Sequence, residues 1–202
     1  MAKWEHRKGQ DILLRTFEQA FEPGDDVRLW LACHQPTPTE RDEEWQRRCA
    51  ESPLADLIEI VPRQPTPADV ATHMAEAHCG VFPARAEGWN LPLLEMLARG
   101  RPVIATDWGA HGAYLDADNA RLVTVDRTEP AVDDRWITVY SERKTGEWAH
   151  LGDAQVEQLT THLRQVHSAR QAGRLQLNDA GIATAARHTW AASAEALVAA
   201  MQ

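Results

Sequence analysis

The stretch FPARAEGWNLPLLEMLARGRPVIAT, residues 82–106, indicates how this chain folds. It continues an apolar run, Cys79–Phe82, that has the length and composition of a buried strand. Pro92 lacks an N–H group, which suits the first turn of a helix, so a helix is expected over residues 91–99. A second apolar run, Pro102–Thr106, predicts the next strand. Strand, corner, helix and strand thus follow one another with short connections.

The same alternation extends toward the N-terminus. Apolar residues at helical spacing predict a first helix over residues 12–21. Alternating helices and short strands favour an α/β fold, in which right-handed crossovers join parallel strands. We therefore predict a Rossmann-like parallel sheet flanked by helices, with ligands bound beyond the carboxyl ends of the strands. The other elements predicted in this half are strands at 27–32 and 57–61 and helices at 40–51 and 66–78.

The C-terminal part is less regular. Residues 117–150 are rich in Asp, Arg and Thr, and they predict an irregular excursion with one strand at Arg121–Val125. Thr189 is a suitable N-cap for the last helix. The chain has no repeat, low-complexity tract or linker, so residues 1–202 are expected to form a single domain. The helices predicted in this part cover residues 152–169, 175–188 and 190–201.

Composition excludes several classes of protein. With 44% apolar and 25% charged residues, the chain is expected to be globular. A net charge of −9 disfavours nucleic acid as a partner, because phosphate neutralisation requires clustered Lys and Arg. Three cysteines without paired spacing and nine histidines without ligand spacing predict neither a disulfide framework nor a metal site. The N-terminus lacks the apolar core of a signal peptide, so we expect a cytoplasmic protein.

The corner between the predicted strand and helix can hold an anion. Because the helix begins near Asn90, Glu87 lies in the loop before it and Glu95 about one turn inside. The free N–H groups at the helix start, together with the helix dipole, attract negative charge. A nucleoside diphosphate sugar fits this spacing, since carboxylates accept hydrogen bonds from ribose and sugar hydroxyls. The N–H groups in question belong to Gly88, Trp89, Asn90 and Leu91.

A purely structural role remains open for the same residues. Glu95 would then complement the helix dipole, and Glu87 would be solvated. Arg7 and Lys8 favour the ligand-binding interpretation, because these cations precede the first helix and can face a diphosphate across the corner. His111, which follows the strand at Pro102–Thr106, is expected to be a loop or capping residue rather than a catalytic one.

Two segments of the chain resemble family 4 glycosyltransferases. They are KWEHRKGQDILL, residues 3–14, and FPARAEGWNLPLLEMLARGRPVIAT, residues 82–106. Members of this family are retaining enzymes of the two-domain GT-B architecture, and the resemblance is to the C-terminal, donor-binding half. It extends in order to the last helix, and therefore over essentially the whole chain.

The resemblance implies a role for each residue of the corner. Glu95 corresponds to the glutamate that binds the ribose, and Glu87 to the one that contacts the donor sugar. Arg7 and Lys8 correspond to the residues that hold the diphosphate, and the amides after Glu87 assist them. The implied reaction is metal-independent transfer of a hexose from a UDP- or GDP-sugar to an acceptor hydroxyl, with retention. Arg7, Lys8 and Glu87 are then the catalytic residues.

The sequence departs from the family pattern at its start. Family members carry an acceptor-binding domain and a first strand ahead of the segment that begins here at Lys3. We therefore expect the acceptor domain and the first strand to be absent from this chain. The acceptor, whether a sugar, a glycan or a lipid-linked sugar, remains undetermined, as do the donor sugar and base.

Three other functions are alternatives to glycosyl transfer. A non-catalytic or truncated nucleotide-sugar binding module has the same corner and remains the alternative. A glycoside hydrolase with Glu87 and Glu95 as its acid–base pair needs neither the cations nor the helix amides. A nicotinamide dehydrogenase is disfavoured, because no Gly-x-Gly-x-x-Gly follows a strand.

Overall fold

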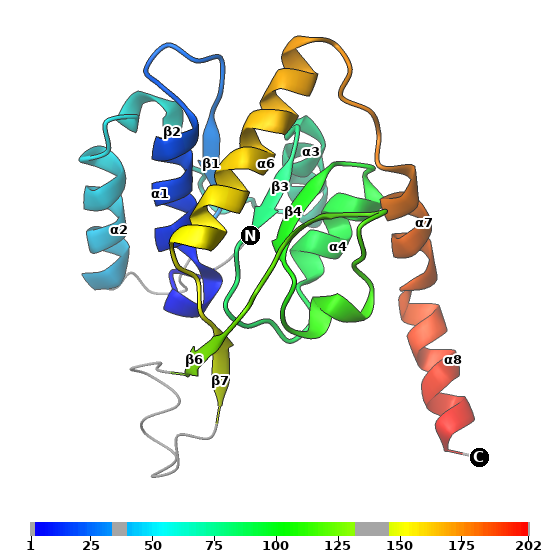
Figure 1. Cartoon of the computed structure of the whole chain (residues 1–202). Helices are drawn as coiled ribbons and strands as arrows, with labels where there is room; N and C mark the ends of the chain where they lie inside the picture. The colour runs from blue at the N-terminus through cyan, green and yellow to red at the C-terminus, as the bar shows by residue number, and fades with distance from the viewer. Residues whose placement is uncertain (1–2, 34–39, 132–145, 202) are drawn as a thin grey trace.

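A computed structural model describes residues 3–33, 40–131 and 146–201, and Figure 1 shows their arrangement. Three short 3₁₀ helices, η1 (His6–Lys8), η2 (Ala55–Leu57) and η3 (Ala110–Ala113), lie between longer elements. The strands are β1 (Leu29–Leu31), β2 (Ile58–Ile60), β3 (Gly80–Phe82), β4 (Val103–Thr106), β5 (Arg121–Val123), β6 (Thr128–Pro130) and β7 (Glu147–Ala149). The helices are α1 (Gln10–Ala20), α2 (Glu40–Ala50), α3 (Pro67–Glu76), α4 (Leu91–Ala98), α6 (Asp153–Gln171), α7 (Asp179–Arg187) and α8 (Trp190–Ala200).

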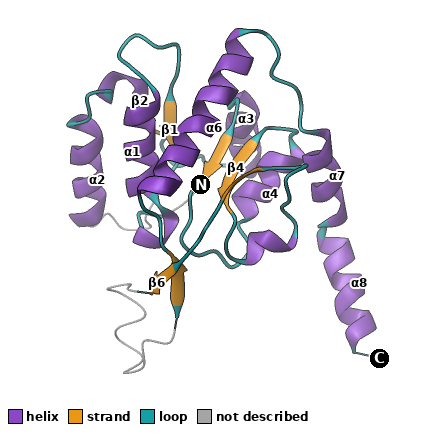
Figure 2. Ribbon diagram, in the orientation of Figure 1, coloured by secondary structure: helices purple, strands orange, loops and turns teal. Residues whose placement is uncertain are grey.

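The predicted α/β fold is confirmed. Strands β1 and β2 pair in parallel, and β3, β4 and β5 form a second parallel ladder in that order. Helices flank these strands on both sides in the ribbon view of Figure 2. Within the described residues, the ladders β1–β2 and β3–β4–β5 are separate, so the parallel strands form two sheets.

Three apolar clusters fill the interior. In the first, α1 packs with β1 and α2, and Trp4 stacks on Trp45 with ring centroids 5.4 Å apart. The second joins α4 to β4, with Leu93 and Leu97 fully buried. The third lies beneath α6, which packs along α1 and runs across the strands in Figure 1. Because both faces of β4 contribute to these clusters, all four of its residues are buried.

The irregular region contains a hairpin that the sequence analysis missed. Strands β6 and β7 pair antiparallel, with Glu129 opposite Trp148. Neither strand has the apolar alternation that predicts a strand, because β6 reads TEP and β7 reads EWA. The predicted strand at Arg121–Val125 is confirmed as β5, which is two residues shorter. Part of the predicted excursion, residues 132–145, lies outside the described residues.

Three helix starts illustrate how local chemistry sets the boundaries. Thr66 caps α3 through a capping box with Asp69, as the start of the predicted helix at 66–78 requires. The helix predicted at 175–188 begins later, at Asp179, because the Asn178 side chain accepts from the Gly181 N–H at 2.8 Å and caps it there. Thr189 caps α8 as predicted.

Among the described helices, none is long and apolar enough to cross a membrane.

Helix α8 extends away from the rest of the chain (Figure 1). None of its residues is buried. Its side chains are almost all apolar, and Trp190 has 83% of its surface exposed. Such a helix lacks the apolar stripe and polar face that a surface helix normally shows.

Candidate functional site

The N-terminal turn of the chain lies directly against the corner after β3. The Arg85 N–H donates to the Arg7 carbonyl at 2.7 Å, although the two residues are far apart in the sequence. Gly9 follows η1 with φ of 72°, and a Cβ atom there would lie 1.8 Å from the Pro83 carbonyl oxygen. Only glycine satisfies both conditions, because other residues rarely adopt this backbone conformation and would collide with Pro83. Gly9 therefore permits η1 to reach the corner.

Arg7 and Lys8, the predicted diphosphate ligands, both meet Glu87. Lys8 Nζ lies 2.5 Å from Glu87 Oε1, and Arg7 Nη1 lies 3.3 Å from Glu87 Oε2. The Glu87 side chain is only 8% exposed, so the alternative that this residue is merely solvated was wrong. Arg7 also pairs with Glu5 through Nη2 at 2.7 Å. The structure thus brings the two cations together with the first glutamate of the corner.

The start of α4 lies immediately after Glu87. Asn90 is the N-cap residue and has φ of 60°, which turns the chain sharply into the helix. Four consecutive backbone N–H groups of this turn have no hydrogen-bond acceptor within residues 3–33, 40–131 and 146–201, and we refer to them as the open amides. Pro92 in the first turn has no N–H to orient, as predicted. The four open amides belong to Gly88, Trp89, Asn90 and Leu91.

Glu95 lies on the outer face of α4. Its side chain is exposed, while Leu94 and Met96 on either side of it are buried. The structure gives no contact between Glu95 and the Arg7 or Lys8 side chains, both of which lie on the Glu87 side of the corner. Arg99, one turn further, donates to the Glu95 backbone carbonyl at 2.8 Å. The exposed carboxylate of Glu95 is therefore accessible to a ligand.

The loop after β4 holds Glu87 from a third direction. The Ala110 N–H donates to the Glu87 carbonyl at 3.2 Å. Gly109, with φ of 95°, comes so close that a Cβ there would lie 3.4 Å from the Glu87 backbone. His111 is fully buried, with Nε2 2.7 Å from the Thr106 carbonyl oxygen, and is therefore a structural residue as predicted. The sequence analysis missed the contact of this loop with Glu87, for which Gly109 was the available signal.

Tyr114 contacts the residues that precede α4. Its hydroxyl donates to the Trp89 carbonyl at 2.6 Å, and its ring lies 5.2 Å from the Trp89 ring. Burial, together with the nearby charge of Glu87, raises the pKa of the Tyr114 hydroxyl above its usual value. The hydroxyl consequently remains a donor throughout the neutral range. Trp89 keeps 39% of its surface exposed at the corner.

Arg85 is the second residue near this site that the sequence analysis missed. Its side chain is only 5% exposed and pairs with Asp11 in the first turn of α1. The two hydrogen bonds to Asp11 are 2.8 and 2.7 Å long. Burial raises the pKa of Asp11, but hydrogen bonding and attraction by Arg85 outweigh this effect and hold that pKa below its usual value. The Asp11 carboxylate is therefore ionised at neutral pH.

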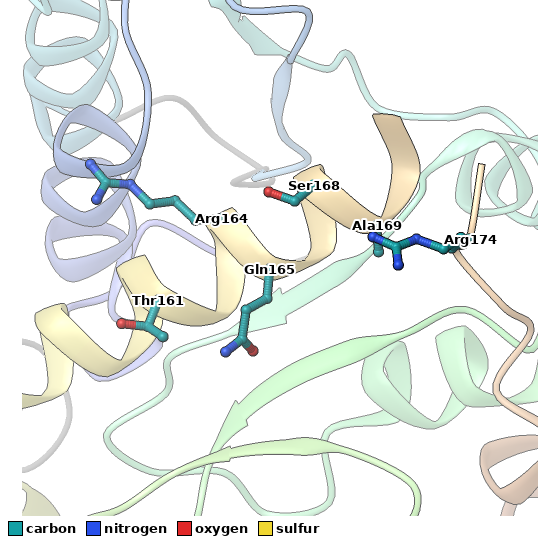
Figure 3. A pocket seen from close by; sticks show the side chains of 6 residues that line it. All are labelled: Thr161, Arg164, Gln165, Ser168, Ala169 and Arg174. Atoms are coloured by element: carbon teal, nitrogen blue, oxygen red, sulfur yellow. The ribbon is translucent and has the colours of Figure 1, made fainter. Parts of the chain in front are cut away.

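A shallow hollow lies away from this corner, on α6, as Figure 3 shows. It contains none of the predicted site residues. No group of three or more His, Cys, Asp and Glu side chains within the described ranges is arranged to hold a metal ion. The hollow is lined by Thr161, Arg164, Gln165, Ser168, Ala169 and Arg174.

Several solved structures share this fold. The C-terminal domain of a glycosyl transferase group 1 family protein (LpcC) from Francisella tularensis aligns with a TM-score of 0.66 and 16% identity, over 91% of this chain and 80% of that domain. Sucrose-phosphate synthase from Thermosynechococcus elongatus aligns with a TM-score of 0.70 and 19% identity, over 98% of this chain and 43% of the synthase. HepE from Anabaena, solved with UDP, aligns with a TM-score of 0.65 and 15% identity, over 92% of this chain and 42% of HepE.

The described α/β fold is therefore that of the C-terminal domain of GT-B glycosyltransferases. The chain spans less than half the length of the synthase and of HepE. No curated protein matches the sequence. A family profile, that of the glycosyl transferases group 1, matches residues 1–140. Because this match extends over more than half of its residues, the chain belongs to the glycosyl transferases group 1 family.

Proposed function

We propose that this chain binds a nucleoside diphosphate sugar at the corner between η1 and α4. The diphosphate would lie between the Arg7 and Lys8 cations and the four open amides of residues 88–91. The observation that supports this arrangement is the convergence of Arg7 and Lys8 on Glu87, directly beside the start of α4. The UDP-bound structure of the similar protein HepE favours the same class of ligand.

The charges at the corner set a condition on binding. Arg7 and Lys8 are matched by the carboxylates of Glu5 and Glu87, so the cations are neutralised before a ligand arrives. An incoming diphosphate would compete with Glu87 for these cations and would gain hydrogen bonds from the helix amides. Each charge-assisted hydrogen bond is worth about 1.5–3 kcal/mol. Glu87, once released, could accept hydrogen bonds from the donor sugar.

The proposed reaction is transfer of the glycosyl group, of the hexosyl type, to an acceptor hydroxyl with retention. The departing diphosphate gains negative charge in the transition state, and Arg7, Lys8 and the amides would stabilise it without a metal ion. Glu95, exposed on α4, would accept hydrogen bonds from the ribose. In this proposal, Glu87 orients the sugar, and all of residues 1–202 form the donor domain.

The acceptor would be bound by another domain. We propose that the acceptor is a sugar, a glycan or a lipid-linked sugar. We also propose that the chain acts in the cytoplasm. A non-catalytic nucleotide-sugar module would share the donor corner without transferring the sugar.

Calorimetry with UDP and GDP tests the donor site. We expect the purified chain to bind one of them and to bind it much less tightly as Arg7→Ala or Lys8→Ala. Unchanged affinity in both variants would show that the diphosphate does not lie at this corner. Release of sugar from the donor by the purified chain would exclude the purely non-catalytic module.

A further inference from the structure

Arg85 connects the N-terminal turn to the corner through its backbone and its side chain at once. Its N–H donates to the Arg7 carbonyl at 2.7 Å, and its Nη1 donates to the His6 carbonyl at 2.9 Å. These two carbonyls immediately precede Lys8. The backbone that carries both predicted phosphate ligands is thus held by a single residue of the corner.

The guanidinium of Arg85 is itself held in place. Asp11 accepts its bidentate pair at 2.8 and 2.7 Å, a geometry that a planar fork satisfies and an ammonium group does not. Asp11 lies in the first turn of α1, where a carboxylate also interacts favourably with the helix dipole. A buried guanidinium without such a partner would be strongly destabilising. Asp11 therefore fixes the orientation from which Arg85 reaches η1.

The β6–β7 hairpin is fastened to the same residue. Arg85 Nε lies 3.4 Å from Glu129 Oε1 on β6, and the Arg85 carbonyl accepts from the Ala149 N–H of β7 at 2.9 Å. His150 Nδ1 lies 2.9 Å from the other Glu129 oxygen and continues the network. The Arg85 guanidinium thus contacts η1, α1 and β6.

We infer that Arg85 is a positioning residue for donor binding, which holds the backbone of η1 so that Arg7 and Lys8 face the diphosphate site. This inference rests on the proposed function and extends it to a residue that would not touch the donor. Arg85 acts through Lys8 and Arg7, and Asp11 keeps it in register. Loss of the fork should therefore weaken nucleotide binding only as long as the cations it positions are present.

A double-mutant cycle tests this dependence. The variants are Arg85→Lys, Lys8→Ala and the double variant, with nucleotide affinity measured by calorimetry in the full chain. Arg85→Lys alone is expected to weaken binding about tenfold, because lysine keeps the charge but loses the bidentate pair and the bond to His6. In the Lys8→Ala background the same change is expected to cost less than about threefold, since coupled residues are not additive. Equal losses in both backgrounds would overturn the inference.

A matched control separates positioning from general loss of charge. Arg15 also lies on α1 and pairs with Asp153, but this pair is exposed and contains none of the residues of the corner. Arg15→Lys should leave nucleotide affinity within about twofold and show no coupling to Lys8→Ala. Coupling of the control to Lys8 would contradict the assignment to Arg85. Circular dichroism establishes that each variant is folded before it is compared.

Hydrogen exchange distinguishes failure of this inference from failure of the proposed function. The Lys8 and Gly9 amides donate to Glu5 and His6 within η1 at 2.9 and 3.1 Å, and their exchange reports how well the turn is held. In Arg85→Lys we expect both amides to exchange about tenfold faster while the β4 amides stay unchanged. If the unmodified chain binds neither UDP nor GDP, the proposed function is wrong. Hydrogen exchange still decides whether Arg85 holds η1 in place. Unchanged exchange at the Lys8 and Gly9 amides in Arg85→Lys would overturn the positioning role of Arg85.

Discussion

Lys8 Nζ lies 2.5 Å from Glu87 Oε1, although 79 positions separate the two residues along the chain. The pair unites the turn before α1 with the corner before α4, and Arg7 joins it through the second Glu87 oxygen. Two cations that share one carboxylate can exchange it for an incoming diphosphate. The predictions below separate the roles of the residues in this arrangement.

Lys8→Ala should weaken nucleotide binding by about 10- to 100-fold, because one charge-assisted hydrogen bond to phosphate is worth about 1.5–3 kcal/mol. Calorimetry in low salt measures the effect, and Arg15→Ala serves as the control because Arg15 pairs with the exposed Asp153. Equal losses in both variants would indicate a general charge effect instead of a specific contact.

Glu87→Gln should separate binding from turnover. Removal of the negative charge frees Arg7 and Lys8 for the diphosphate, so the affinity for free nucleotide should stay the same or rise by up to about tenfold. Sugar release should fall, because the glutamine no longer offers a carboxylate to the donor sugar. Binding is measured by calorimetry and sugar release by chromatography of the donor. A loss of nucleotide affinity in this variant would contradict the competition between Glu87 and the diphosphate.

Glu95→Ala should abolish the preference for a ribose with intact hydroxyls. Because Glu95 is exposed, its removal should leave the unfolding free energy unchanged within about 0.5 kcal/mol. The ratio of affinities for UDP and 2′-deoxy-UDP, or for UDP and 3′-deoxy-UDP, should fall toward one in this variant. The matched control is Glu157→Ala, which removes an exposed carboxylate from α6. Retention of both ratios would show that Glu95 does not hold the ribose.

Gly9→Ala should destabilise the chain by about 2–4 kcal/mol in urea unfolding, because it adds backbone strain and a collision with Pro83. Gly24→Ala is the control for strain alone. Gly24 has φ of 102° with open space around it, and its replacement should cost about 1–2 kcal/mol. If both changes cost the same, the close approach of η1 to Pro83 contributes nothing to stability.

Asp11→Asn should destabilise the chain at neutral pH and much less in acid. The folded pKa of Asp11 lies below its usual value, so its contribution to stability is present above the unfolded pKa and is lost as pH falls through the folded pKa. Unfolding free energies of both proteins should therefore differ at neutral pH and converge as the pH falls through the folded pKa of Asp11. Asp153→Asn, at an exposed position, is the control. A difference that does not change with pH would contradict the ion pair with Arg85.

The sequence predicted those parts of the fold that depend on local patterns. The strand and helix around Pro92 follow from an apolar run and a missing N–H, and both were found within one or two residues. The β6–β7 hairpin was missed because Pro130 and the charged residues beside it give no strand pattern. Glu129 of β6 pairs with Arg85, and such long-range contacts leave no periodic signal in a single sequence.

The candidate site divides along the same line. Arg7, Lys8 and Glu87 were selected by residue type and by resemblance, and the structure places them in contact. The pairing of Glu87 with Arg7 and Lys8 was not foreseen, because charge pairing across 79 positions cannot be read from spacing. Arg85 was passed over for the same reason, since it lies in the loop after β3 and its partner Asp11 lies on α1.

The glycine that fits η1 against Pro83 ties the placement of both cations to one close backbone contact, in addition to the hydrogen bonds from Arg85. Local opening of this turn in mild denaturant would move both positive side chains away from the corner while the strands and helices behind it persist. Nucleotide affinity should consequently disappear at a lower denaturant concentration than the far-ultraviolet signal of the helices.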